Sequence, residues 1–483
     1  MNDANRAPLA AAMKAYAASG VLAFHTPGHK QGLGAHPLLR DFVTAEGLRA
    51  EVSLADELDD LHRPESCLKE AQEKAARLWG ADEAFFAVNG TTGAIHAMLL
   101  AALSLGDEVI VPRNIHRSVV GGLVLCGARP VYIVPERDEM LGIAHGVTAS
   151  SVRRALEKHP AARAVLAVYP TYYGVASELE EIAAAAHEKG VPLLVDEAHG
   201  AHLRFSDALP TDAISCGADL VAQSTHKLLG AMTQASMLFR KDRRVPAERV
   251  RRAASLLATT SPNYLLMASL DIARLQMEEN GEQLVARAVR LSEELRAAVN
   301  ELPGLWCFGR ERMGRAGAAA LDLTKLTVNV SGLGLSGEEA MRLLREKNIQ
   351  AELADERNVL FIVSMADTER ETRRLFDALS ALSRENAGRQ SLAIPSVLTP
   401  PDLVAELTPR ETFYAARQSV PLAQAAGCIA AEEVTFYPPG IPAIVPGERI
   451  STEAVEYLRE MMLLGLKVTG ARDPSLQWID VVQ

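Results

Sequence analysis

The sequence predicts an α/β protein built on a doubly wound, mostly parallel sheet. Through the central third of the chain, short and almost wholly apolar runs alternate with helical patterns. Such runs are typical of strands that are buried on both faces, as in parallel sheets covered by helices. The expected strands are 84–88, 108–111, 130–134, 164–168, 192–195, 219–222 and 236–239.

Three helical patterns adjoin these strands. Pro64 is expected to begin a helix that Gly80 ends, because proline suits the first helical turn and glycine suits the residue after the last. A second helix is expected at 94–103. A third, at 265–299, is expected to carry the chain out of the main sheet domain.

The rest of the chain predicts two further parts. Strands at 326–330 and 359–363 and a helix at 337–347 indicate a smaller α/β domain, and 384–401 has the composition of a linker. The expected division is an amino-terminal segment, a large domain, a small domain and a carboxy-terminal domain, at 1–50, 51–290, 291–385 and 395–483.

Composition excludes several classes of function. The 483 residues are 48% hydrophobic and 23% charged, as in globular domains, and the formal net charge is −11. This charge disfavours nucleic acid and anionic membranes as partners. The five cysteines have no CxxC spacing, which favours reduced thiols in the cytoplasm over disulfides or zinc, and no metal site is expected. The chain lacks an apolar export signal or membrane-spanning run.

The turn Asn89–Gly93 is a candidate anion-binding site. It joins an expected strand to an expected helix, where backbone N–H groups and threonine hydroxyls can hold a phosphate. A turn of this composition is also common without any ligand. This turn therefore indicates a phosphate site only in combination with the other motifs of the chain.

Lys227 and Asp196 indicate a cofactor site. Each follows an apolar strand, at the carboxyl ends where open α/β sheets bind ligands. A lysine in a partly dry pocket near other cations becomes a nucleophile that forms a Schiff base with an aldehyde such as pyridoxal phosphate. A carboxylate suits the protonated ring nitrogen of that cofactor. A solvated surface lysine and a helix-capping aspartate are the alternatives.

Five motifs in this order resemble the ornithine/lysine/arginine decarboxylases of pyridoxal-phosphate fold type I, and the chain is similar to short bacterial arginine-directed members. They are Asn89-Gly90-Thr91-Thr92, Asn114-Ile115-His116-Arg117-Ser118, Asp196-Glu197-Ala198-His199, Ser224-Thr225-His226-Lys227 and Tyr437-Pro438-Pro439-Gly440-Ile441-Pro442. The resemblance implies an aspartate aminotransferase-like large domain, a smaller α/β domain and a carboxy-terminal domain. It begins near His25, so an extra amino-terminal domain and the high-order rings built through it are not expected.

The resemblance also implies roles in the site. Lys227 would carry pyridoxal phosphate, Asp196 would pair with its ring nitrogen, and Ala198 and His116 would lie against its two faces. The phosphate would be held by the Gly90 turn and by the side chains Thr91, Thr92, Ser224 and His226. His199 and His202 are interpreted as structural.

A basic substrate requires acidic side chains. The candidates, which the sequence does not rank, are Asp56, Glu57, Asp59, Asp60 and Glu448. The run 56–60 has the alternative interpretation of a solvated face. The resemblance implies a homodimer, or a dimer of dimers, with the loop 25–30 and the run 56–60 near the partner's site.

The expected reaction is decarboxylation of a basic amino acid, with arginine first, lysine second and ornithine third by analogy. Lys227 would release the cofactor to the substrate, and the carboxylate would leave perpendicular to the cofactor ring. Another fold type I reaction such as aminotransfer would use Asp196 and Lys227 equally. A non-catalytic regulatory relative is a further alternative, although it would be expected to have lost one of these two residues.

Overall fold

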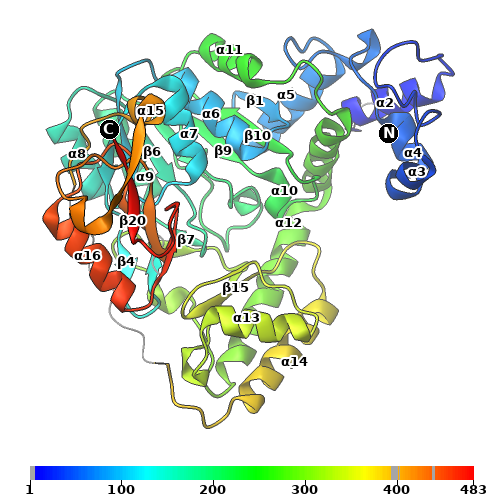
Figure 1. Ribbon diagram of the computed structural model, residues 1–483. Coiled ribbons are helices and arrows are strands. Elements are labelled where there is room, and N and C mark those ends of the chain that lie inside the picture. Colours follow the sequence, from blue (N-terminus) through cyan, green and yellow to red (C-terminus); the bar gives the residue numbers. More distant parts are fainter. Residues whose placement is uncertain (1–5, 393–400, 402, 438–440) are drawn as a thin grey trace. The chain divides into compact units, whose positions relative to one another are not determined.

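The computed structural model describes residues 6–392, 401, 403–437 and 441–483, and the chain divides into two compact units (Figure 1). The first unit comprises 1–102, 192–206 and 211–283. The second comprises 103–191, 207–210 and 284–483. Both units contain strands of the main sheet, so the strand pairings are described separately for each unit.

The largest sheet has seven strands in the order β1-β10-β9-β8-β6-β2-β3. Their bounds are β1 Glu83–Ala87, β2 Glu108–Pro112, β3 Arg129–Ile133, β6 Ala162–Val168, β8 Leu193–Asp196, β9 Leu220–Gln223 and β10 Ser236–Arg240. All seven expected strands are confirmed to within two residues at each end. Buried valine, isoleucine, leucine and alanine side chains fill β2, β6, β8 and β9, as expected for strands covered on both faces.

Strand directions confirm a mostly parallel sheet. In the first unit β8 pairs with β9 in parallel, whereas β10 is antiparallel to both β9 and β1. In the second unit β2 pairs in parallel with β3 and with β6. Among these pairings, β10 is the strand that runs antiparallel to its neighbours. It follows β9 after a connection that contains the short helix α10 (Thr225–Leu228).

Helix α5 (Cys67–Trp79) begins three residues later than the proline signal suggested, so the expectation that Pro64 starts it is wrong. The reason is Asp59, whose carboxylate accepts the N–H groups of Ser66 and Leu68 at 2.7 and 3.1 Å and holds the first turn in place. The end of the helix is as expected, because Gly80 takes the left-handed conformation at φ +74°.

Helix α6 (Gly90–Ala102) begins at Gly90 rather than at Ala94. The turn expected at Asn89–Gly93 is therefore largely the first helical turn itself. Gly90 has φ +64°, a value that glycine adopts without strain. Its N–H donates to the carbonyl of Gln234 at 2.9 Å, which ties the helix start to the segment before β10.

The second unit contains the smaller α/β part. Its four-stranded sheet has the order β11-β13-β15-β14, with β11 Trp306–Cys307, β13 Lys325–Asn329, β14 Leu353–Ala354 and β15 Asn358–Ile362. Helices α13 (Gly337–Glu346) and α14 (Glu369–Glu385) pack with it around a core of its own (Figure 1). The two strands and the helix expected here are confirmed.

The carboxy-terminal part has a separate hydrophobic core. It contains the strand pair β16 (Arg417–Pro421) and β20 (Trp478–Val482), and the sheet β18-β17-β19 at Ile441–Ile444, Val434–Tyr437 and Lys467–Thr469. Helix α16 (Thr452–Leu463) contributes buried side chains to that core. Residues 393–400 of the expected linker and 438–440 of the last motif lie outside the described residues, and the fourfold domain division stays a prediction.

The remaining elements connect these parts. The other helices are α2 Pro8–Ala18, α3 Pro37–Val43, α4 Ala45–Ala50, α7 Arg117–Cys126, α8 Ala149–Lys158, α9 Leu179–Glu188, α11 Ala247–Leu257, α12 Tyr264–Asn300 and α15 Pro409–Tyr414. Short strands are β4 Arg137–Asp138, β5 Ile143–Ala144, β7 Val175–Ala176 and β12 Ala320–Leu321. Among the residues that the structure describes, no helix combines the length and apolar character that crossing a membrane requires.

We predict that Asp59→Ala lowers the free energy of unfolding by about 0.5–2 kcal/mol, the usual effect of losing a helix cap. Burial alone would raise the pKa of Asp59, but the N–H groups of Glu65, Ser66, Asp60 and Lys69 together lower it. The folded state therefore gains stability above pH about 4, the unfolded value, and loses it as the pH falls through the lower folded pKa.

Denaturant unfolding at several pH values measures this effect. The wild-type advantage over Asp59→Ala should be complete at neutral pH and shrink in acid. Glu57→Ala is the control, because Glu57 is an exposed acid in the same segment. An Asp59→Ala protein as stable as this control would contradict the capping role.

Candidate active site

Asp196 and Lys227 lie at the carboxyl ends of neighbouring parallel strands. Asp196 is the last residue of β8 and pairs in register with Ala222 of β9. Ser224 follows β9, and Lys227 lies on the short helix α10 that begins at Thr225. The predicted arrangement of one carboxylate and one amine on adjacent strands is therefore present in the first unit.

A buried carboxyl group braces these two strand ends. Glu197 is fully buried, and its side chain accepts the N–H of Ala213 at 2.8 Å and the amide Nε2 of Gln223 at 2.6 Å. Burial, with a smaller contribution from Asp212, raises the pKa of Glu197 well above its usual value. A Cβ at Gly200 would come within 2.5 Å of Glu197 Cγ, so the loop after β8 requires glycine there.

The amine of Lys227 has a defined neighbour. Its Nζ lies 3.0 Å from Nε2 of His199, which is 7% exposed and belongs to the loop after β8. Lys227 itself is exposed in the single chain, so the partly dry pocket expected around it is not formed by this chain's described residues. Its position explains this, because the residue lies on the open side of a four-residue helix whose other face carries the buried Thr225 and Leu228.

Three hydroxyl groups meet at the start of α6. Thr91 Oγ1 is hydrogen-bonded to Ser224 Oγ and lies 2.9 Å from Ser236 Oγ. All three side chains are buried, whereas Thr92 next along the helix is exposed. Hydroxyls at the amino terminus of a 13-residue helix form an arrangement that suits a phosphate group. The structure thus brings Thr91 and Ser224 together and adds Ser236.

His226 and Ala198 are held by backbone contacts. Nδ1 of His226 lies 2.9 Å from the carbonyl oxygen of Ala235. Because a carbonyl only accepts, Nδ1 carries a hydrogen and Nε2 is left for another partner. The N–H of Ala198 donates to Asp196 Oδ1 at 3.2 Å. This hydrogen bond orients the carboxylate at the carboxyl end of β8.

His116 belongs to the second unit, where it caps α7. Its Nδ1 accepts the N–H of Ser118 at 3.2 Å and lies 2.7 Å from the hydroxyl of the same residue. These two contacts fix the ring orientation. The stacking role implied by the resemblance stays a prediction.

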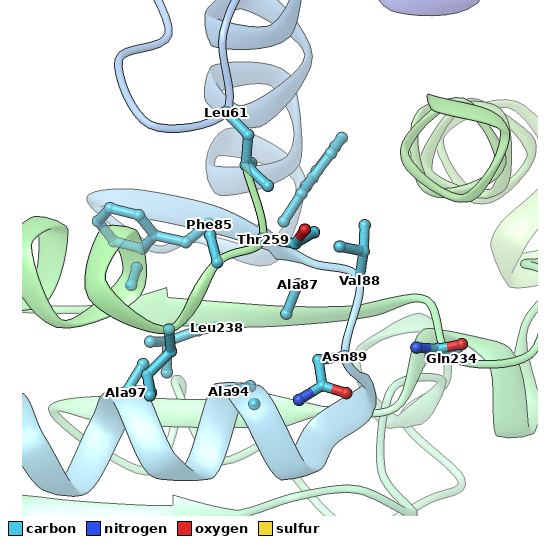
Figure 2. A pocket seen from close by; sticks show the side chains of 15 residues that line it. Leu61, Phe85, Ala87, Val88, Asn89, Ala94, Ala97, Gln234, Leu238 and Thr259 are labelled. Atoms are coloured by element: carbon cyan, nitrogen blue, oxygen red, sulfur yellow. The ribbon is translucent and has the colours of Figure 1, made fainter. Parts of the chain in front are cut away.

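A cavity of about 340 Å³ adjoins β1 and α6 in the first unit (Figure 2). Its walls are mainly apolar, with Phe85 and Leu238 among them, and the polar side chains of Asn89, Gln234 and Thr259 also line it. None of the amine, carboxylate and hydroxyl groups described above lines this cavity. It is therefore separate from the cluster around Lys227.

Two of the acidic candidates have structural partners. Both carboxylate oxygens of Asp59 are used by the start of α5, as described above. Glu448 is 1% exposed and forms a two-pronged ion pair with Arg113 at 2.6 and 2.7 Å. Neither carboxylate is available to a substrate cation, so the structure argues against these two candidates. The local sequence could not reveal this, because Arg113 lies 335 residues from Glu448.

The other acidic candidates are Glu57, Asp60 and Asp56. Among the described contacts, Glu57 and Asp60 form no comparable buried ion pair or helix cap. Glu57 is exposed, and Asp60 is partly buried with one oxygen accepting the N–H of His62 at 2.9 Å. Asp56 begins a short 3-10 helix, but its side chain lies outside the described part of the structure. A substrate-binding role for these three stays a prediction.

Taken together, the described donors fit pyridoxal phosphate. An amine that can bond to the aldehyde, a buried carboxylate for the ring nitrogen and a hydroxyl cluster at a helix terminus are all present in one unit. The structure adds two residues to this cluster. From the sequence alone, Ser236 was placed at the start of an apolar strand and His199 was interpreted as structural. Among the described residues, no group of His, Cys, Asp or Glu side chains is arranged to hold a metal ion.

Comparison with known proteins gives consistent matches. Residues 7–314 match the sequence model of the Orn/Lys/Arg decarboxylase major domain, and 395–470 match that of the C-terminal domain. The arginine decarboxylase of Bacillus subtilis (strain 168) is 42% identical over 99% of this chain and 98% of the relative. The arginine decarboxylase of Halalkalibacterium halodurans is 42% identical over 100% of this chain and 99% of the relative.

Solved structures agree at the level of the fold. The Francisella novicida lysine decarboxylase LdcF has a TM-score of 0.84 at 23% identity, over 99% of this chain and 81% of that chain. The predicted fold class is confirmed by this likeness.

We predict that Glu448→Gln lowers the free energy of unfolding by about 3 kcal/mol, because it leaves the buried guanidinium of Arg113 without its counter-charge. Thermal and denaturant unfolding measure the loss. The double variant Arg113→Met/Glu448→Leu should recover part of it, since neither charge then remains buried. Glu406→Gln, which removes an exposed partner of Arg449, is the control and should change little. Equal effects of the two glutamine variants would contradict the role given to the buried pair.

Proposed function

Because the chain belongs to the Orn/Lys/Arg decarboxylase family, we propose that it converts L-arginine to agmatine and CO2. The observation that carries this choice is 42% identity to arginine decarboxylases over almost the full length of both chains. The likeness to the Francisella novicida lysine decarboxylase LdcF, at 23% identity, concerns the fold alone. Lysine and then ornithine are the next candidate substrates.

The enzyme is a decarboxylase that depends on pyridoxal phosphate. When bound, this cofactor supplies an electron sink for the bond between Cα and the departing carboxylate. We assign Lys227 as the residue that bonds to its aldehyde carbon and Asp196 as the partner of its ring nitrogen. Ala198 and His116 are assigned to the two faces of the ring.

The chain's own groups supply charge and orientation. Asp196 is 5% exposed, so its carboxylate stabilises a protonated ring nitrogen more strongly than it would in water. Thr91, Ser224 and Ser236 would hold the phosphate of the cofactor, and Nε2 of His226 would donate a further hydrogen bond to it. We assign Gly90 and Thr92 to the same phosphate site as parts of the first turn of α6.

We assign the distal cation of the substrate to the acidic segment before α5. Glu57 is exposed, and Asp60 is partly buried, with Oδ1 accepting the N–H of His62. Asp56 precedes them in the same segment. A guanidinium presents a planar fork of donors, which two neighbouring carboxylates can receive together.

No observation favours aminotransfer over decarboxylation. An aminotransferase needs an arginine for the α-carboxylate, and Arg357 and Arg204 are both engaged elsewhere. Arg357 donates to the carbonyl oxygens of Glu139 and Met140 at 2.9 and 2.8 Å. Arg204 donates to the carbonyl oxygen of Leu78 and is paired with Asp212.

The amino-terminal arm supports a homodimer. Between Ser19 and Val43 it exposes several large apolar side chains, including Leu22 at 78%, Phe24 at 93%, Leu33 at 81% and Phe42 at 90%. Several large apolar side chains exposed in one short segment favour an interaction site there. We propose that a second copy of the chain covers it, and that the dimer works in the cytoplasm, where the five free thiols stay reduced.

The proposed reaction predicts agmatine formation when the protein loaded with pyridoxal phosphate is given arginine. Arginine, lysine and ornithine should be supplied in parallel, and the amine products separated and quantified. Lys227→Ala should abolish product, because no other amine replaces the covalent attachment. Cadaverine or putrescine as the sole product would move the assignment to lysine or ornithine. In a parallel assay that contains a 2-oxo acid as amino acceptor, conversion of this acceptor to its amino acid without release of CO2 would favour aminotransfer.

For the assembly, we predict that Leu33→Asp/Phe42→Asp converts a dimer to a monomer in light-scattering measurements of mass. Each aspartate would be desolvated in the interface, which is unfavourable without a partner charge. Leu463→Asp is the control, since Leu463 is 87% exposed on α16, outside the arm. A wild-type protein that is monomeric at micromolar concentration would refute the dimer.

A further inference from the structure

His199 is placed to act on the amine of Lys227. The two groups come from different strand ends, β8 and β9, and their nitrogen atoms lie 3.0 Å apart. His199 is only 7% exposed, so the surrounding protein restricts the orientation of its ring. The contact joins two segments whose register is fixed by the pairing of β8 with β9.

The chemistry of the two groups defines the direction of this hydrogen bond. At neutral pH a lysine side chain is ordinarily an ammonium group, with three donors and no acceptor. Nε2 of His199 must then accept, and the ring hydrogen lies on Nδ1. A covalent bond to an aldehyde carbon, however, requires the nitrogen lone pair of the neutral amine. The proton on Nζ has to leave first, and Nε2 of His199 is an acceptor in contact with it.

We propose that His199 is the base that takes this proton from Lys227. The ammonium of Lys227 transfers H⁺ to His199 Nε2, and the resulting amine nitrogen bonds to an aldehyde carbon. Water leaves as the carbon–nitrogen double bond forms. The proposal rests on the assignment of Lys227 as the cofactor lysine, and it gives a catalytic role to a residue first interpreted as structural.

Neighbouring ionisable groups have other roles. Asp196 receives the N–H of Ala198, and Glu197 is turned to Ala213 and Gln223. On the α10 side, His226 faces the carbonyl of Ala235 through Nδ1. The contact with Nζ on which the proposal rests is the one made by Nε2 of His199 at 3.0 Å.

The test measures the reactivity of Lys227 in cofactor-free protein, so it needs neither substrate nor turnover. Formaldehyde forms a carbon–nitrogen double bond with the amine, and cyanoborohydride supplies the hydride that reduces it. Mass spectrometry of peptides then follows methylation of Lys227 over time at neutral pH. Lys241, an exposed lysine paired with Asp82, reports on reagent concentration in the same sample.

Two variants separate the proton transfer from the hydrogen bond. His199→Gln keeps an amide near the position of Nε2 but cannot take up a proton, and His199→Ala removes the side chain. Both should slow methylation of Lys227 on the order of 100-fold, as loss of a general base does, with Lys241 unchanged. Added imidazole should restore most of the rate in His199→Ala and none in His199→Gln, whose side chain fills the space.

His202→Gln is the matched control, because it replaces another buried histidine of the same loop. It should leave methylation of Lys227 at the wild-type rate, and circular dichroism should show that all three variants fold. A wild-type rate in His199→Gln would overturn the proposal and leave only a positioning hydrogen bond. A slow His199→Ala that imidazole does not restore would overturn it as well.

The result is independent of the proposed reaction. If agmatine forms but Lys227 reacts equally fast with and without His199, the base role is wrong and the decarboxylase assignment stands. If methylation depends on His199 but none of the three amino acids yields an amine, the substrate assignment is wrong and the proton transfer stands.

Discussion

The geometry of the candidate site depends on the hydrogen bonds of one buried carboxyl group, that of Glu197. It connects the loop after β8 to the last residue of β9 through Gln223 and to the segment at Ala213. These contacts hold the strand ends that carry Asp196 and Lys227 in place. Because an unpaired carboxyl in this position would be costly to bury, the brace also excludes alternative conformations of the loop. Rigid strand ends, with reactive groups one step beyond them, are what a site for a planar cofactor needs.

Much of the fold was predictable because the information was local. The apolar runs at 108–111, 192–195 and 219–222 are buried on both faces, and a continuous apolar run reports that burial directly. Helix starts were less predictable. Pro64 carried a normal start signal, yet α5 begins at Cys67 because a carboxylate seven residues before Ser66 takes its N–H. No local propensity contains that contact.

The same distinction divides the site residues. The placement of Asp196, Lys227, Thr91 and Ser224 could be predicted, since each lies at a strand end or a helix start, whereas their roles stay predictions. Glu448 could not be judged, because its charge is neutralised by a distant arginine. Ser236 was hidden at the start of an apolar strand. His199 lay inside a recognised motif, but its contact with Lys227 becomes visible only when two strand ends are side by side.

The ion pair of Arg113 and Glu448 has a consequence for how the chain is made. Arg113, only 5% exposed, is satisfied by the carboxylate of Glu448 and by the carbonyl oxygens of Pro442 and Ala443. On a ribosome that adds about 5–20 residues per second, this glutamate follows the arginine by roughly 20 to 70 s. During that interval the end of β2 carries a cation whose counter-charge has not yet been synthesised. The second unit can therefore close around β2 only near the end of translation, and a prematurely terminated chain would keep a charge where the core should form.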